Sequence, residues 1–386
     1  MSPRVCVMTS AHPPSDVRIF HKQCKSLARA GYEVILVAPA DASGRPAGVE
    51  LRHVHRSHSR LRRILFTTRA VYRAARDARA DVYHFHDPEL IPAGLFLRLR
   101  GKQVIYDIHE DLPRTFSYKP YIPKWLVGLL ASLVDFSEKI FARGFSALIA
   151  ASPEIAARFR SHPRVAVVQN YPRLEEFQVD RASAPRSRKS GYVVYVGLRI
   201  TRARGAEEMV RAMGLLPDNM PVRLKLVGTV EPPELLAQLQ SLDGWKRTDY
   251  LGPLDREGVA EVLRSASAGL VVLHPEPNYL LAHPVKLFEY MCAGIPVIAS
   301  DFPVCRQVVQ PSGCGLLVDP QNPREIASAI DFLCCDPQRA AEMGSRGREA
   351  VLTRYNWSAE ERILLELYRR LRGARVAYDE LKAEAT

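Results

Sequence analysis

Short apolar runs rich in β-branched residues alternate with helix-like segments along the chain, and this alternation constrains the fold more than any other feature. The run Arg4–Ser10 is followed by a helical pattern near Val17–Ala30 and by a second run at Glu33–Ala38. This order of strand, helix and strand predicts parallel strands that helices cover on both faces. We therefore expect doubly wound α/β sheets, in which ligands bind beyond the carboxyl ends of the strands.

The same pattern continues to the last third of the chain. The remaining strand candidates are Val49–Val54, Asp81–His86, Gln103–His109, Ala147–Ala151 and Val165–Asn170, followed by Tyr192–Val196, Arg223–Val227, Asp249–Leu251, Gly269–Leu273, Pro296–Ser300 and Gly315–Val318. Helix-like sequence lies between them, so both halves of the chain are typical of Rossmann-like units.

The length of the chain predicts two domains, because 386 residues exceed one ordinary core. We expect a first domain at 1–172, a polar connection rich in Arg and Ser at 173–190, and a second domain at 191–356. The segment 357–386 is interpreted as a C-terminal helix that could pack back across the first domain. The cleft between the domains is the expected place for a site.

Composition excludes several classes of protein. Apolar content of 47% and charged content of 25% are ordinary for a globular chain. Seven cysteines without a C-x-x-C pair indicate neither a disulfide framework nor a zinc site, which fits a reducing cytoplasm. The longest uncharged apolar run, Trp125–Val134, is about half of a membrane span, and no signal sequence precedes the first strand. We expect a cytoplasmic protein.

The positive charge requires an anionic partner. The formal net charge is +12, and segment 52–79 has nine arginines against the single acid Asp77. Nucleic acid is not expected, because no recognition motif accompanies the charge. Arg60–Arg76 places apolar residues on one helical face and arginines around the rest, which predicts peripheral contact with the inner face of an anionic membrane. The alternative is an ordinary first-domain helix with a solvated basic back. Tyr121–Phe145 either adds apolar membrane contact or packs over an acceptor site.

A loop that enters a helix is the strongest candidate site. The loop His274–Asn278 follows a strand, and Pro284–Gly294 has proline at a helix start and glycine at its end. Lys286 and Glu289 share one face near the helix N-terminus, where free N–H groups favour phosphate. Lys286 can neutralise a diphosphate, and Glu289 can accept hydrogen bonds from ribose hydroxyls. The alternative is a surface ion pair worth a few tenths of a kcal/mol.

The segment Leu273–Ser300 resembles the donor-binding segment of retaining GT-B glycosyltransferases of family four, the glycosyl transferases group 1. Ser15–Lys22, Val104–Asp111 and Tyr195–Gly197 are also similar to that family, as is Arg204 followed by glycine. The resemblance extends over essentially the whole chain. It implies a GT-B fold of two facing Rossmann-like domains, with the acceptor mainly at the first, the nucleotide at the second and no obligatory metal.

The resemblance also implies roles for particular residues. Arg204 would contact the leaving phosphate, where a fixed cation stabilises developing charge. Lys286 would share this role, and His109 would contact the donor sugar or its phosphate from the first domain. The residues expected to bind the donor are Arg199, Gly228, Asn278, Tyr279 and Glu289. The alternatives are a solvated basic loop and a structural histidine.

Other polar residues near strand ends are weaker candidates. Glu110 could act as a nucleophile or base, but enzymes of the resembled class are thought to react without a protein nucleophile. His84, His86 and Asp87 lack further ligands at a recognisable spacing, so they are interpreted as loop anchors and not as a metal site.

The chain departs from the commoner family pattern at three places. Leu281 stands where the first Glu of the family's E-x7-E motif is usual, His12–Asp16 replaces a glycine pair, and Leu198 displaces Arg199 by one position. A branch of the family that has the motif P-x-K-x-x-E-Y shares these departures. We therefore interpret them as variation of the family pattern and not as its loss. The donor sugar would then be held by Asn278, His283 or backbone groups of the loop.

The expected activity is that of a metal-independent, retaining hexosyl- or N-acetylhexosaminyl-transferase. It would move a sugar from a nucleoside diphosphate sugar to a hydroxyl of a lipid-linked or polysaccharide acceptor, in cell-surface glycan synthesis. Two alternatives stay open: a UDP-N-acetylglucosamine-type epimerase of GT-B architecture, and an inactive accessory subunit. The D-x-D clamp and the Walker A sequence are missing, and Gly313–Gly315 does not extend to a dinucleotide fingerprint.

Overall fold

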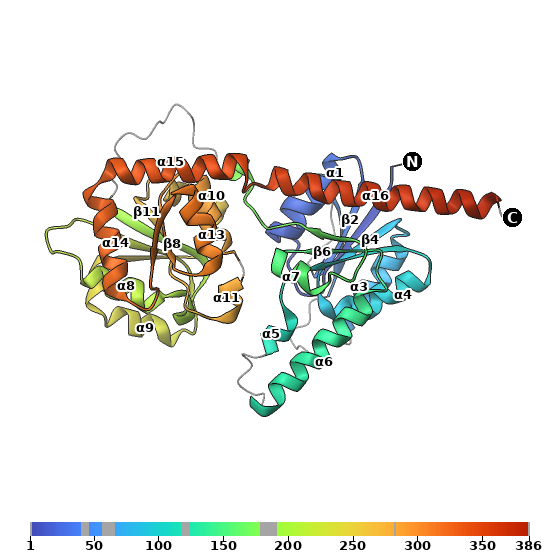
Figure 1. Cartoon of the computed structure of the whole chain (residues 1–386), viewed down its shortest axis with the longest axis horizontal. Coiled ribbons are helices and arrows are strands. Elements are labelled where there is room, and N and C mark those ends of the chain that lie inside the picture. The colour runs from blue at the N-terminus through green and yellow to red at the C-terminus, as the bar shows by residue number, and fades with distance from the viewer. Residues whose placement is uncertain are drawn as a thin grey trace. The chain divides into compact units, whose positions relative to one another are not determined.

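The computed structural model describes residues 2–39, 46–55, 66–116, 124–177, 191–281 and 283–384. The chain divides into two compact units (Figure 1). Unit 1 comprises residues 1–170 together with 357–386, and unit 2 comprises residues 171–356. The expected cleft between the domains stays a prediction.

Unit 1 contains a seven-stranded parallel sheet in the order β3-β2-β1-β4-β5-β6-β7. Its strands are β1 Arg4–Met8, β2 Glu33–Pro39, β3 Glu50–Val54, β4 Val82–Phe85, β5 Gln103–Ile108, β6 Ala147–Ala150 and β7 Val165–Val167. Alternate residues of the central strands enter two different core clusters, one on each face. Burial on both faces explains why these strands are continuous apolar runs.

The helices of unit 1 flank this sheet. They are η1 Val17–Cys24, α1 Lys25–Arg29, η2 Pro46–Gly48, α3 Thr68–Asp77, η4 Pro88–Leu90, α4 Ile91–Leu99, α5 Leu112–Phe116, α6 Lys124–Ala142, α7 Pro153–Arg158 and α16 Trp357–Glu384. The first helix opens as a π-helix, η1, where the sequence predicts a single regular helix. Its N-cap is Asp16, whose carboxylate accepts from the backbone N–H of Ile19 at 2.9 Å.

The last helix, α16, is part of the core of unit 1. Trp357 and Leu364 are buried in the same cluster as Val5 of β1. The indole nitrogen of Trp357 donates to Ser26 Oγ at 2.9 Å, and the hydroxyl of Tyr368 lies 2.9 Å from His84 Nδ1. The C-terminal helix therefore closes one face of the first sheet (Figure 1).

Glu360 at the start of α16 should make the stability of unit 1 depend on pH. Burial raises the pKa of its carboxyl to about 7, against an ordinary value of 4.5, although the N–H of Gln169 and the charges of Arg18 and Lys22 oppose this. Because the folded state then holds a proton that the unfolded state releases, stability falls as the pH rises between these two values. Between these two pH values, the free energy of unfolding of Glu360→Gln should fall by about 1–3 kcal/mol less than that of the unaltered protein. Urea unfolding at both ends of the window measures the difference.

The neighbouring, partly exposed Glu361 provides the control for this prediction. Its carboxylate lies 3.5 Å from Arg29. Glu361→Gln should leave the pH dependence of stability as it is in the unaltered protein. Equal pH profiles for Glu360→Gln and the unaltered protein would contradict the prediction.

Unit 2 contains a six-stranded parallel sheet in the order β10-β9-β8-β11-β12-β13. Its strands are β8 Tyr192–Ile200, β9 Arg223–Val230, β10 Thr248–Gly252, β11 Ala268–Val271, β12 Val297–Ser300 and β13 Gly315–Val318. Its helices are η5 Leu174–Phe177, η6 Arg202–Arg204, α8 Ala206–Gly214, α9 Glu234–Gln240, η7 Asp243–Arg247, α10 Arg256–Arg264, α11 Pro277–Leu281, α12 Val285–Cys292, α13 Pro303–Ser312, α14 Pro323–Cys335 and α15 Pro337–Thr353. Two core clusters again cover the two faces.

The prediction of doubly wound parallel sheets is confirmed in both units. Within the segment interpreted as a polar connection, Leu174–Phe177 forms the 3-10 helix η5. Residues 178–190 lie outside the described part of the chain. Among the described residues, no helix has the length and apolar character that a membrane crossing needs.

Each sheet has one place where the strand order reverses. In unit 1 the chain runs outward from β1 to β2 and β3 and returns on the other side as β4. In unit 2 it runs from β8 to β9 and β10 and returns as β11. Ligands of doubly wound sheets bind where the loops diverge at such points. The loops after β1 and β4, and after β8 and β11, are therefore the places to examine.

Candidate functional site

A buried amine lies at the reversal point of unit 2. The side-chain nitrogen of Lys286, on α12, is 3.5 Å from the ring centroid of Tyr195 on β8. It is inaccessible to solvent and has no hydrogen-bond partner among the described residues. Burial lowers the pKa of Lys286 well below its usual range; the charge of Arg204 adds to this effect, and that of Glu289 opposes it. A buried nitrogen without a partner is costly unless an anion binds there.

Gly197 makes room for this amine. A Cβ at position 197 would lie 3.0 Å from Lys286 Nζ and 2.9 Å from the hydroxyl of Tyr195. Gly228 on β9 in turn passes directly beneath Gly197: its φ is 138°, and a Cβ there would collide with the Gly197 carbonyl oxygen. Close packing of two strands therefore accounts for Gly228, whose expected role in donor binding stays a prediction.

Arg204 is held at the start of α8, near the same amine. Its Nε donates to the hydroxyl of Tyr279 at 3.3 Å, and its Nη1 donates to the carbonyl of Arg199 at 3.3 Å. The next residue, Gly205, has φ 72°, and a Cβ there would collide with the Val272 carbonyl oxygen. Only glycine suits this turn. The Arg204 guanidinium and the Lys286 amine thus lie near each other at a helix N-terminus, an arrangement that favours a phosphate-bearing ligand.

Arg199 does not join this pair of cations. The sequence places Arg199 in a loop after Val196, but β8 continues through an irregularity at this point to Ile200. The Arg199 side chain is exposed, and its Nε lies 3.3 Å from Glu231. The placement of Arg199 in the loop is therefore wrong, because the strand is longer than its first apolar run.

Glu289 is bound by an arginine and not by Lys286. Its carboxylate accepts from Arg256 Nη1 at 3.0 Å, and the same guanidinium also binds Glu176 of η5. The interpretation of Lys286 and Glu289 as a solvated surface ion pair is wrong, since the lysine nitrogen is buried. The carboxylate of Glu289 retains a second oxygen for a ligand.

Of the remaining candidates in unit 2, Asn278 and Tyr279 lie on the short helix α11. The side chains of Asn278 and Leu281 lie outside what the structure describes. The loop before α11 is fixed to the loop of Arg204, because the backbone N–H of His274 donates to the carbonyl of Ala203 at 2.9 Å. His274 Nε2 also lies 3.0 Å from Glu208.

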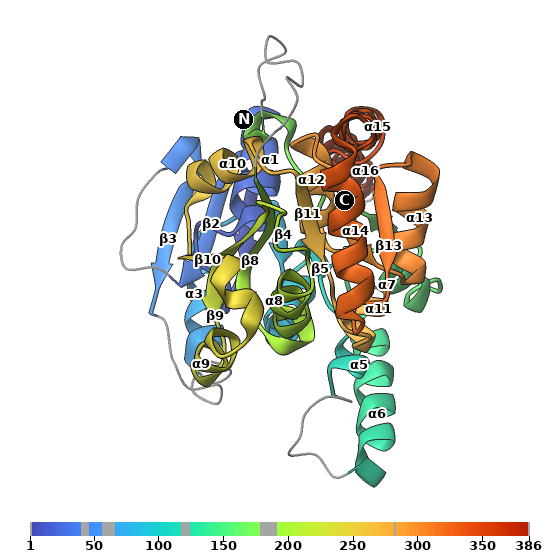
Figure 2. The same ribbon diagram turned by 90° about the vertical axis from the view of Figure 1, so that its left-hand side faces the viewer.

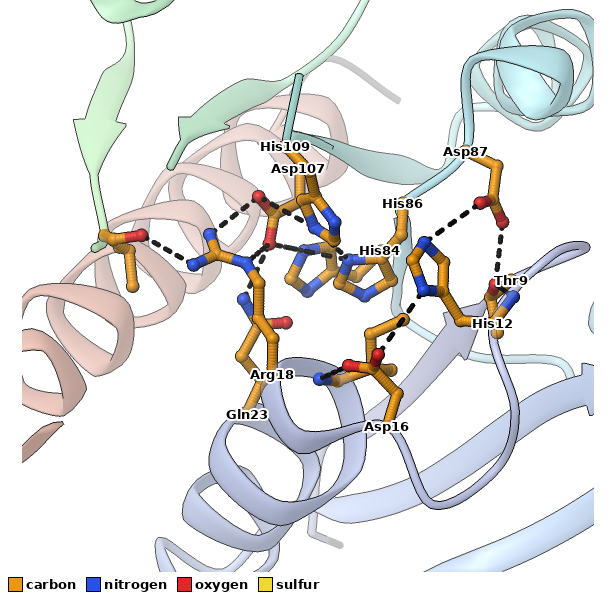
Figure 3. A network of polar contacts seen from close by, with 12 residues as sticks. Thr9, His12, Asp16, Arg18, Gln23, His84, His86, Asp87, Asp107 and His109 are labelled. Atoms are coloured by element: carbon orange, nitrogen blue, oxygen red, sulfur yellow. Dashed lines mark hydrogen bonds and ion pairs between the residues drawn. The ribbon is translucent and has the colours of Figure 1, made fainter. Parts of the chain in front are cut away.

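At the reversal point of unit 1, Asp87 joins the loops after β1 and β4. Its Oδ2 accepts from the hydroxyl of Thr9 at 2.7 Å and from the backbone N–H of Ser10 at 2.6 Å (Figure 3). His12 lies between Asp16 at 3.4 Å and Asp87 at 3.5 Å. Hydrogen bonding to Asp16 raises the pKa of His12, as does the charge of Asp87, although burial opposes them. The contacts of Asp87 agree with its interpretation as a loop anchor.

A buried carboxylate, Asp107 on β5, organises the rest of this region (Figure 3). It accepts from Arg18 at 2.8 Å and 3.2 Å, once at each oxygen, and from Gln23 Nε2 at 2.6 Å. Burial alone would raise the pKa of Asp107, but the charges of Arg18 and His109 outweigh burial and hold the pKa well below its usual range. Asp107 is therefore an ionised group inside the core.

Three histidines surround this carboxylate. His84 Nε2, His86 Nδ1 and His109 Nε2 lie 3.6, 3.5 and 3.4 Å from Asp107 oxygens. His86 Nδ1 is also 3.0 Å from His109 Nε2. His84 and His86 are fully buried as side chains, whereas 18% of the His109 side chain is exposed. Among the three, His109 is the one that solvent reaches, and Glu110 beside it is exposed.

A group of side chains is spaced closely enough to bind a metal ion. It consists of His84, His86 and Asp107, whose ligand atoms lie within 4.8 Å of one another. The third member of this group is Asp107 and not the Asp87 that follows β4 in sequence. Arg18 already occupies both oxygens of the carboxylate, and its positive charge opposes a cation there. We therefore interpret the cluster as a hydrogen-bonded core network.

One signal for this network is present in the sequence, although neither composition nor a motif contains it. A carboxylate in the middle of a buried strand must find partners, so Asp107 predicts a buried cation somewhere in the fold. The partner Arg18 lies 89 residues away, and no local pattern identifies it. Tyr195 carries part of the family resemblance, but no local pattern predicts that its ring lies beneath the Lys286 amine.

Comparison with known families agrees with this geometry. Residues 176–350 match the family model of glycosyl transferases group 1, and residues 17–171 match that of the glycosyl transferase 4-like domain. Phosphatidyl-myo-inositol mannosyltransferase of Mycolicibacterium smegmatis is 25% identical, over 89% of this chain and 87% of the relative. D-inositol 3-phosphate glycosyltransferase of Corynebacterium urealyticum is 28% identical, over 56% and 54%.

Solved structures share the fold. Sucrose-phosphate synthase from Thermosynechococcus elongatus has a TM-score of 0.77 at 22% identity, over 96% of this chain and 100% of that one. Anabaena HepE in complex with UDP and glucose has a TM-score of 0.72 at 16% identity, over 95% and 100%. The prediction of a GT-B fold with two Rossmann-like parallel sheets is confirmed.

Proposed function

We propose that this glycosyltransferase, whose two halves belong to the glycosyl transferase 4-like and glycosyl transferases group 1 families, uses a nucleoside diphosphate sugar as its donor. One observation carries the proposal: the amine of Lys286 is buried without a hydrogen-bond partner among the described residues, beside Arg204 and in the first turn of α12. A diphosphate would supply the missing negative charge. The HepE complex with UDP and glucose supports a UDP-sugar as one candidate donor.

In the proposed mechanism, Arg204 and Lys286 bind the diphosphate and stabilise the charge that grows as the sugar leaves. Glu289 accepts from the ribose hydroxyls while Arg256 fixes its carboxylate. Tyr279 sets the direction of the Arg204 guanidinium through its hydroxyl. Asn278 and the role of His109 toward the sugar rest on the family resemblance.

We also propose retention of anomeric configuration, hexosyl or N-acetylhexosaminyl transfer without a metal, and a lipid-linked or polysaccharide acceptor in cell-surface glycan synthesis. Retention and metal independence rest on the resemblance of Leu273–Ser300 to the donor segment of retaining enzymes. The acceptor class is supported by the relative named phosphatidyl-myo-inositol mannosyltransferase, whose name contains a lipid.

A thermal-shift screen against UDP-, GDP- and dTDP-sugars tests the proposal first, because a ligand of the folded state raises the melting temperature. The stabilising donor is then incubated with and without acceptor lipids, and the anomeric proton of the product is recorded by NMR. Isomerised donor in the absence of acceptor would identify an epimerase. Binding with neither transfer nor donor hydrolysis would identify an accessory subunit. Inversion at the anomeric carbon would overturn retention.

Replacing Glu289 tests its place in the donor site. Glu289→Ala should lower kcat/KM for the donor by roughly a hundredfold, about 2.7 kcal/mol, because the ribose loses an ionised acceptor. Donor hydrolysis and transfer by the purified, folded variant measure the effect. Glu261→Ala, at an exposed ion pair with Arg264, serves as the control and should keep normal rates. Normal kcat/KM in Glu289→Ala would remove this residue from the site.

Peripheral contact with the inner face of an anionic membrane also belongs to the proposal. Of the segment Arg60–Arg76, residues 60–65 lie outside the described part. In α3, Val71 and Ala75 are buried in the core, so the apolar side of this helix is used by the sheet. Arg69, Arg73 and Arg76 are exposed and supply positive charge for lipid headgroups.

A further inference from the structure

Helix α6 carries a row of large apolar side chains on its solvent side. Trp125, Leu129, Leu133, Phe136 and Ile140 are 81%, 57%, 54%, 65% and 43% exposed. Their spacing of three and four residues places them along one face of the helix. We call these five side chains the α6 stripe. With 19 residues, the helix is about 28 Å long at a rise of about 1.5 Å per residue. Figures 1 and 2 show α6 extending away from the sheet of unit 1, with α5 beside it.

Polar contacts on the opposite face fix the direction of the α6 stripe. Glu138 is buried and accepts from the hydroxyl of Tyr106 at 2.9 Å and from Arg158 at 2.7 Å. Asp135 accepts from Arg158 at 2.8 Å and from Lys139 at 2.6 Å. Both acids of the helix therefore face Arg158, and rotating the stripe inward would break a buried ion pair. The stripe faces outward because the inner face is anchored.

The exposed charge near the C-terminal end of the stripe is basic. The exposed positions of α6 carry no acid, and exposed Arg143 follows its last turn. Helix α4 adds exposed Phe96 and Leu99, and it is joined to the end of α6 because Arg98 Nε donates to the Gly144 carbonyl at 2.9 Å. The next helix, α3, contacts α4 and presents its exposed arginines.

The combination of positive charge and exposed apolar area indicates which partner covers the α6 stripe. A second copy of this chain would bring the same basic helices together, and the net charge of +12 opposes such a pair. An anionic lipid surface matches both features, since headgroups attract the arginines while the interfacial layer receives Trp, Leu and Phe side chains. A helix in this role lies in the membrane plane with its apolar face about 5–10 Å deep.

We propose that α6 is a membrane-docking helix that inserts the α6 stripe into the interfacial layer of an anionic bilayer. This inference rests on the proposed function, because docking would bring the enzyme to a lipid-linked acceptor. The stripe adds an apolar contact to the charged contact that the arginines of α3 make with lipid headgroups.

Vesicle binding without any sugar donor tests the docking surface separately from catalysis. The probes are vesicles of pure phosphatidylcholine and of equal parts phosphatidylcholine and phosphatidylglycerol. The triple variant Leu129→Ser, Leu133→Ser, Phe136→Ser should lower partitioning onto the anionic vesicles by about tenfold or more. A matched triple, Leu215→Ser, Phe332→Ser, Leu352→Ser, replaces exposed apolar side chains of unit 2 and should bind like the unaltered protein.

The fluorescence of Trp125 reports insertion directly. The chain has three tryptophans, of which Trp357 is buried and Trp125 is the most exposed. Anionic vesicles should shift the emission to the blue, brominated acyl chains should quench it, and Trp125→Phe should abolish the shift. Both triple variants should retain donor hydrolysis in the absence of vesicles, which separates a failure of docking from a failure of the proposed function.

Four results would overturn the docking proposal or its requirement for anionic lipid. The stripe variant could bind anionic vesicles as tightly as the unaltered protein. Trp125 emission could stay unchanged when vesicles are added. Sedimentation without lipid could show a dimer that the stripe variant loses, which would assign the stripe to a second copy. Equal binding to pure phosphatidylcholine would overturn the requirement for anionic lipid.

Discussion

A Lys286→Met variant should fold at least as well as the unaltered protein and should lose nucleotide-sugar turnover by roughly two to four orders of magnitude. The two effects have opposite signs because the amine is buried over Tyr195 with no hydrogen-bond partner among the described residues. A thioether of similar length removes that desolvated nitrogen, which favours folding. It also removes a cation from the place where the leaving diphosphate gains charge. Melting temperature and single-turnover transfer measure the two effects on one sample.

Proton uptake on donor binding distinguishes this explanation from loss of packing. Burial lowers the pKa of Lys286 well below its usual range, and the charge of Arg204 lowers it further, although Glu289 opposes both. A diphosphate reverses the balance and raises the pKa of the amine, so UDP binding should be accompanied by proton uptake at pH values between the pKa of the free and of the bound protein. Calorimetry in two buffers of different ionisation enthalpy should show this uptake in the unaltered protein and none in Lys286→Met.

Lys225 offers a matched control in the same unit. Its amine also lies over a tyrosine, 3.7 Å from the ring centroid of Tyr192, but near the beginning of the strands. Lys225→Met removes the same group from a similar contact and should leave turnover unchanged. If folded Lys286→Met transfers sugar at the normal rate, the buried amine is a packing feature and the proposed diphosphate site is wrong.

The strands were predictable because the information for them is local. A strand buried on both faces needs a run of apolar residues, so runs such as Glu33–Ala38 and Gln103–His109 mark β2 and β5 within one residue at each end. The predicted bounds are wrong where a strand and its apolar run differ in length: β7 ends at Val167 and not at Asn170, and other strands outlast their apolar run. Strand β8 continues past Gly197 to Ile200, with exposed Leu198 and Arg199 in its last part.

The site was predictable only in part, for the same reason. Proline before α12 and glycine after Arg204 are local signals for helix starts, and they identified both cations. Contacts between distant segments have no such signal. The partner of Asp107 lies 89 residues away, and the partner of His84 lies 284 residues away. Hydrophobic periodicity predicts that a side chain is buried, but it does not predict which other side chain it contacts.

Asp107→Asn should lower the free energy of unfolding by about 3–5 kcal/mol, which is the cost of leaving a buried charge without its partner. Arg18 is 5% exposed and binds both oxygens of the carboxylate, so the substitution leaves its guanidinium in the core beside a neutral amide. The low pKa of Asp107, held by Arg18 and His109 against burial, means that this stabilisation is present at neutral pH and is lost only as the pH falls through the folded-state pKa. Urea unfolding at neutral pH measures the loss.

An exposed pair of the same chemistry provides the control for Asp107. Arg223 binds both oxygens of Asp249 at the surface of unit 2, at 2.6 to 3.1 Å. Asp249→Asn should cost less than about 1 kcal/mol, because water replaces the lost contact.

A double variant separates the ion pair from its surroundings. Removing both charges in Arg18→Met with Asp107→Asn should cost less than the two single changes together, since neither ion is then left alone in the core. Equal stability of Asp107→Asn and the unaltered protein, or strict additivity of the two changes, would show that the carboxylate is stabilised by other groups. Gln23, His84, His86 and His109 would then be the residues to replace next, because they are further polar neighbours of that carboxylate.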